Sequence, residues 1–145
     1  MNSARSTVMV GIASAATAGL CATAAPASAV YDVRNFPTVY AVAEGGLCLA
    51  QIDAGVGPES QGLASFLVRS NTYGVGACSV PITLSWRNLD TGETGTRTVA
   101  VPGPGSWGVG RSALFRPGGV GNFTATLTVG TAHLPEPGSI EFHVD

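Results

Sequence analysis

The chain has 145 residues, and its seven basic residues are all arginines, against nine acidic residues and a formal net charge of −2 at pH 7. This composition offers no basic patch that would gather phosphates, so nucleic acid is not an expected partner. The length and the 45% share of hydrophobic residues suffice to build one hydrophobic core.

The first 29 residues have the features of a secretory signal peptide. Arg5 precedes an apolar run from Val8 to Leu20, and Ala27-Ser28-Ala29 supplies the A-x-A cleavage pattern. We therefore expect residues 1–29 to be removed and residues 30–145 to form a single domain. The run is shorter than the roughly 20 apolar residues of a membrane span, and no later segment replaces it. No transmembrane helix is expected in the mature chain.

A competing interpretation begins at Cys21, which follows the apolar run at the place where a bacterial lipoprotein carries its lipidated cysteine. Lipoprotein signals place a leucine three positions before that cysteine and a small residue directly before it. Here Ala18 and Leu20 occupy those two positions in the reverse order. Cleavage after Ala29 is preferred, and lipidation would instead turn residues 22–37 into a tether.

Two cysteines remain after the leader is removed, Cys48 and Cys78. An even number of cysteines in an exported chain predicts a disulfide. Two cysteines without a C-x-x-C spacing favour neither a structural zinc site nor redox work. A bridge closing a loop of about 30 residues stabilises a fold by roughly 3.5 kcal/mol in the chain-entropy model. Together with the leader, it predicts an extracellular protein, released or held at the cell envelope.

Beyond the leader, apolar and polar residues alternate with a period of two, as in strands with one buried face. The clearest case is Val80–Trp86, and the pattern recurs in Asn122–Val129 and Ile140–Val144. Less regular strands are expected over residues 38–44, 47–53, 63–69, 96–101 and 111–115. Turns rich in Gly and Pro separate about seven or eight short strands, which favours an all-β, antiparallel Greek-key β-sandwich.

The segment RPGGVGNFTATLTV, residues 116–129, is similar in cadence to a late strand of immunoglobulin-like and fibronectin-type sandwiches. The lack of lysine beside abundant Ala, Gly, Val and Thr resembles secreted proteins of high-GC Gram-positive bacteria. The resemblance implies an immunoglobulin-like fold. Both cysteines precede Trp86, however, and the tyrosine expected two residues before the second cysteine is missing. We therefore expect the disulfide not to be the usual inter-sheet bridge, and no antibody-like recognition is carried over.

Three aromatic residues are candidates for contacts. Trp86 is in phase with the apolar positions of its strand, which predicts core packing. Pro81 falls on the opposite face and indicates a sheet edge or the outer rim. Trp107 and Tyr73 stand in Gly-rich segments interpreted as loops, where each ring either plugs the sandwich or contacts a partner. Tyr73 and Trp107 are the predicted contact surface. If both rings are exposed at the same end of the sandwich, they form an apolar patch of the kind that marks a partner surface.

No residue pattern points to catalysis, a metal or a cofactor. His133 and His143 are ten residues apart, which is no zinc spacing, and neither belongs to a motif. The G-x-S-x-G nucleophile motif is absent. The acidic residues include turn formers and give no clear catalytic pair. We expect a protein that is not an enzyme and carries no cofactor.

The leading hypothesis is an exported, non-catalytic β-sandwich that contacts an unknown protein or envelope component. The alternative is an inhibitor of a secreted hydrolase, which would present residues 102–108 or 53–61 as a loop to an enzyme cleft. A third and weaker hypothesis, a small hydrolase, needs histidines or paired carboxylates that converge in space.

Overall fold

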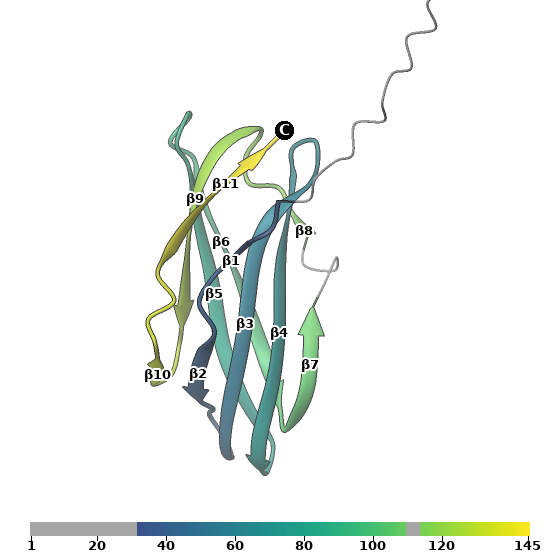
Figure 1. Ribbon diagram of the computed structural model, residues 1–145, viewed down its shortest axis with the longest axis vertical. Coiled ribbons are helices and arrows are strands. Elements are labelled where there is room, and N and C mark those ends of the chain that lie inside the picture. The colour runs from purple at the N-terminus through teal and green to yellow at the C-terminus, as the bar shows by residue number, and fades with distance from the viewer. Residues whose placement is uncertain (1–31, 110–113) are drawn as a thin grey trace, which may run out of the picture.

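The computed structural model describes residues 32–109 and 114–145. The predicted signal peptide, its cleavage after Ala29 and the Cys21 alternative lie outside the described residues. The described part is all-β, and none of its residues is helical. Its strands form two antiparallel sheets that enclose one hydrophobic core (Figure 1).

The first sheet, sheet A, has seven strands in the order β10-β2-β3-β4-β7, with β1 beside β3 and β8 beside β4. Its strands are β1 (Arg34–Asn35), β2 (Val39–Val42), β3 (Leu47–Ser60), β4 (Leu63–Val75), β7 (Gly105–Val109), β8 (Leu114–Phe115) and β10 (His133–Leu134). The second sheet, sheet B, has four strands in the order β11-β9-β5-β6. They are β5 (Cys78–Asn88), β6 (Thr94–Gly103), β9 (Gly121–Val129) and β11 (Ser139–Val144).

The strands are longer than the sequence pattern predicts, because several glycines expected in turns lie inside β3. A Cβ atom on Gly55 would lie 2.7 Å from Asn35 Oδ1, and one on Gly57 would lie 3.0 Å from Val33 Cα. These glycines let β1 and the residue before it lie directly against β3. They serve close backbone packing rather than chain reversal.

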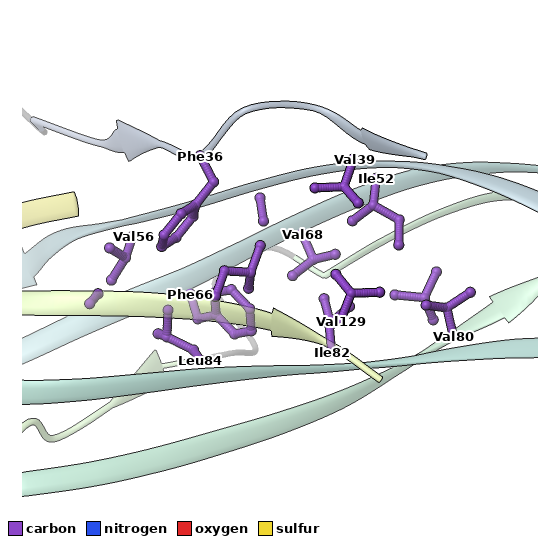
Figure 2. Close-up of a cluster of buried hydrophobic side chains, with 14 of the residues drawn as sticks. Phe36, Val39, Ile52, Val56, Phe66, Val68, Val80, Ile82, Leu84 and Val129 are labelled. Atoms are coloured by element: carbon purple, nitrogen blue, oxygen red, sulfur yellow. The ribbon is translucent and has the colours of Figure 1, made fainter. Parts of the chain in front are cut away.

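The core lies between the inward faces of the two sheets. Val80, Ile82 and Leu84 of β5 are fully buried, which confirms the alternation predicted for this segment. Figure 2 shows these side chains pointing toward residues of sheet A such as Phe66 and Val68. Trp86, at the end of the same alternation, is half-buried against the core. Its ring centroid lies 4.3 Å from that of Phe115.

Pro81 lies at the end of a central strand, where only β6 pairs with it, which agrees with the edge or rim position predicted for this end of the strand. Strand β5 pairs with β6 along its length and with β9 only from Ile82 onward. Pro81 therefore lies just beyond the β9 ladder, where its missing N–H breaks no strand pairing. Its carbonyl still accepts a hydrogen bond of 2.8 Å from the amide of Gly130.

The disulfide between Cys48 and Cys78 is present, with a Cα–Cα distance of 6.4 Å. Cys48 belongs to β3 of sheet A and Cys78 to β5 of sheet B, so the bridge joins the two sheets. The expectation that it is not the usual bridge of antibody-type domains stays a prediction, because it depends on an immunoglobulin-like assignment of the strands. The position of the cysteines relative to Trp86 does not reveal that the chain crosses between sheets after β4.

Candidate functional site

The outward positions of β2, β3 and β4 carry apolar side chains where a sheet facing water usually carries polar ones. The patch continues onto β10, and we call it the apolar face. Its seven members are Tyr40 (50% exposed), Val42 (55%), Leu47 (82%), Leu49 (49%), Tyr73 (64%), Val75 (68%) and Leu134 (76%). The described part of the chain has two other exposed large hydrophobic residues, Leu89 and Val120, in the segments after β5 and before β9.

The strand register makes this patch continuous. Leu49 stands opposite Val42 of β2 on one side and opposite Tyr73 of β4 on the other. Leu47 stands opposite Val75, and Leu134 opposite Tyr40. Directly opposed side chains in antiparallel strands have Cβ atoms about 4.5–5.5 Å apart. The register places Leu49 at the centre of the apolar face. The residues of the face belong to β2 and to the ends of β3 and β4 that lie at the bottom of Figure 1.

A groove opens at the side of the apolar face nearest β10. It is lined by Tyr40, Val42, Leu49 and residues 132–134, and its volume is about 310 Å³. Most of this lining is apolar, as is usual where a protein receives the side chain of a partner or a small ligand. The apolar face thus combines an open surface with one concave margin.

His133 closes the groove at the β10 margin and is held between two acceptors. Its Nδ1 lies 2.6 Å from the carbonyl oxygen of Thr131, and its Nε2 lies 3.3 Å from Glu136 Oε2. Only the doubly protonated imidazolium can donate to both oxygens. The bond to Thr131 raises the pKa of His133 above 6.5, burial opposes the rise, and Glu136 adds to it. The cationic form therefore favours the observed position of β10.

A polar row borders the apolar face toward the middle of the sheet. Gln51 stands opposite Asn71, and Asn71 opposite Ser106, whose Oγ donates to Asn71 Oδ1 at 2.7 Å. One row further, Asp53 stands opposite Arg69. The side chains of the apolar face carry no formal charge. The first charged pair beyond the polar row, Asp53 and Arg69, has one residue of each sign.

The two predicted contact residues lie on strands and on opposite sides of sheet A, so the expectation that both occupy loops is wrong. Tyr73 belongs to β4 and is part of the apolar face. Trp107 belongs to β7 and stands opposite Ser70, which is only 4% exposed. Its ring therefore points inward and packs against the core, as a plug does. The two rings do not form one patch.

Of the seven members of the apolar face, the sequence predicts only Tyr73 as a contact residue and misses the other six. The sequence predicts less regular strands over residues 38–44 and 47–53 and assigns no exposed face to either. The signal was present in VYAV, residues 39–42, and LCLA, residues 47–50, where apolar residues occupy both alternating sets. Such a run indicates either a strand buried on both faces or an exposed apolar one.

The groups considered for catalysis and inhibition are placed as follows. His143 Nδ1 lies 3.0 Å from Asn122 Oδ1, and its Nε2 lies 3.2 Å from Asp145 Oδ1. His143 belongs to sheet B, whereas His133 belongs to sheet A. Within residues 32–109 and 114–145, no group of three or more His, Cys, Asp or Glu side chains could hold a metal ion. Most of residues 53–61 and 102–108, the proposed inhibitory loops, lie in strands β3, β6 and β7.

The described residues also contain no helix long and apolar enough to span a membrane. The search for relatives covered family models, curated proteins and solved structures, and nothing matches this chain in any of the three.

Proposed function

We propose that the chain is an exported, non-catalytic domain that works by surface contact, with the apolar face of sheet A as its contact surface. One observation carries the proposal: seven of the nine exposed large hydrophobic residues in the described part of the chain adjoin one another on one side of one sheet. The signal peptide predicted from the sequence and the Cys48–Cys78 bridge support an extracellular setting.

The size of the apolar face supports a role in binding. A fully exposed valine, leucine or tyrosine presents roughly 150–230 Å², so the exposed fractions of the seven whole residues, backbone and hydroxyl atoms included, correspond to about 800 Å². The largest apolar patch of a typical soluble monomer is about 300–600 Å². Larger patches with a polar border mark interaction sites, because leaving them in water is unfavourable.

The chemistry of the apolar face favours a partner that itself presents apolar surface. Five of the seven side chains are aliphatic and make no hydrogen bonds, and none of the seven is charged. A phosphate backbone requires cationic groups, which the face lacks, and a glycan requires many hydrogen-bonding groups, of which the face offers only the hydroxyls of Tyr40 and Tyr73. A protein surface or an apolar envelope component fits it better.

We further propose that the two sheets form an immunoglobulin-like Greek-key sandwich. The order β11-β9-β5-β6 opposite β3-β4-β7 supports this assignment. After β4 the chain crosses to the β5–β6 hairpin, returns to pair β7 with β4, and crosses again to place β9 beside β5. Alternation of this kind is typical of immunoglobulin-type sandwiches. The contact surface would then lie on a sheet face and not on the end loops that antibodies use.

Photo-cross-linking in the producing cell tests the proposed contact surface. A benzophenone side chain replaces Tyr73 in one variant and Leu89, exposed to 50% and outside the face, in the control. We expect the exported protein to give a discrete cross-linked product from position 73 that excess unlabelled protein competes away, and none from position 89. Equal yields from both positions, or no product from position 73, would refute the proposed surface.

A further inference from the structure

We propose that the apolar face binds the apolar face of a second copy of the chain, giving a two-fold symmetric dimer in which two A sheets stack. This inference rests on the proposed function, because it names the partner of the same surface. It goes further by committing to one occupant, and it predicts an assembly that forms from the purified protein alone.

The area of the apolar face matches the need of a dimer. A stable protein interface of standard size buries about 800 Å² on each partner, which is the area estimated for this face. Interfaces between different proteins are on average no more apolar than the rest of the surface, whereas homodimer interfaces are markedly more so. A patch made only of Val, Leu and Tyr has the composition of the second class.

The charge distribution also favours a copy of the chain. Two copies of the chain carry a net charge of the same sign, so a contact surface without charged side chains adds no local repulsion between them. None of the seven side chains of the apolar face is charged. At its margin the imidazolium of His133 is paired with Glu136, and beyond the polar row Asp53 and Arg69 have opposite signs. Stacked faces of antiparallel sheets are a common packing, with interdigitated side chains about 10 Å deep.

The edge of sheet B offers a poorer route to self-association. Strand β6 forms one edge of that sheet and is ten residues long. Arg97 in β6 stands opposite the fully buried Leu84, so its side chain points inward, and its Nη1 donates to the carbonyl oxygen of Leu114 at 3.3 Å. An inward-pointing charge on an edge strand disfavours pairing with another chain. The β6 edge is therefore a less favourable surface for self-association than the apolar face.

Sedimentation equilibrium of the purified exported protein, with its disulfide intact, tests the dimer. We expect twice the mass of one chain at about 50 µM, since standard-size interfaces give dissociation constants in the micromolar range or below. Leu49→Lys should raise the dissociation constant at least about 100-fold, because a two-fold axis through the face brings the two lysines together. Leu89→Lys is the matched control, since Leu89 is 50% and Leu49 49% exposed, and it should remain dimeric.

A charge-exchange experiment separates loss of the interface from loss of the fold. Leu49→Glu should also be monomeric, and an equimolar mixture of Leu49→Lys and Leu49→Glu should regain the dimer mass. Recovery requires the two positions to face each other in different copies, which a misfolded variant cannot mimic. Circular dichroism should give both variants the spectrum of the unmodified protein.

The outcomes distinguish this inference from the proposed function. A monomeric parent protein at about 50 µM overturns the dimer, and the proposed surface then stands or falls by cross-linking from position 73. A dimer that Leu49→Lys leaves intact also overturns the inference. A monomeric parent without any product from position 73 overturns both proposals. A dimer lost in each single variant and regained in the mixture supports both.

Discussion

The disulfide allows a prediction whose size follows from the fold. Replacing Cys48 and Cys78 by alanine removes a covalent link between β3 and β5, 30 residues apart in sequence and in different sheets. In the chain-entropy model, opening a closed loop of that length lowers the free energy of unfolding by roughly 3.5 kcal/mol. With a urea dependence of about 1–3 kcal/mol/M, the unfolding midpoint should fall by roughly 1–3 M.

Equilibrium urea unfolding followed by tryptophan fluorescence measures this shift. The parent protein treated with a reductant is the matched comparison, because it loses the bridge and keeps both sulfur atoms. Reduction and the double replacement should shift the midpoint by similar amounts if the link itself stabilises the fold. A shift below about 1 kcal/mol in both samples would refute the reasoning, since it would mean that the unfolded chain gains little freedom.

Three further predictions concern the backbone, the core and pH. Gly74→Ala should destabilise the fold strongly, since Gly74 has a φ of 147° and an added Cβ would strike backbone atoms of β3. Gly62→Ala is the control, because a Cβ there meets open space, and it should lower the free energy of unfolding by only about 1 kcal/mol. Urea unfolding measures both. Ile82→Ala should cost about 2–5 kcal/mol in the same assay, because Ile82 is fully buried, and a loss below about 1 kcal/mol would contradict that packing. The pKa of His133 lies above its ordinary 6.5, so its contribution to stability is complete below that pH and is lost as the pH rises through the folded pKa. An NMR titration should give His133 a pKa above 6.5 in the parent protein and a lower pKa, closer to 6.5, in Glu136→Gln. A His133 pKa at or below 6.5 in the parent protein would refute the two-acceptor geometry.

The regular strands were predictable because one physical rule determines them. In Val80–Trp86 and Asn122–Val129 each second residue is apolar and faces the core, so period-two patterning suffices. The ends of β3 and β4 were not predictable in the same way. Gly55, Gly57 and Gly74 resemble turn residues in sequence, yet they lie inside strands where another backbone segment passes too closely for a side chain.

The candidate site was predictable only in part. Tyr73 was named, because a large aromatic in a Gly-rich segment stands out, whereas Trp107 shares that local context and points inward. The side of sheet A on which each ring lies depends on the strand register. Trp107 points inward because the β4–β7 pairing places it opposite the buried Ser70. Leu49 and Leu134 join one patch through pairings of residues far apart in sequence, which local patterning does not contain.

Hydroxyl-radical footprinting of the exported protein, in the culture medium and on the cells that make it, tests the central claim most directly. The account predicts that the seven side chains of the apolar face are oxidised far more slowly than their exposed fractions of 49–82% imply, while Leu89 and Val120 react at the rates expected for theirs. Oxidation of the apolar face at the full rate expected for a free surface, in both fractions, would contradict it.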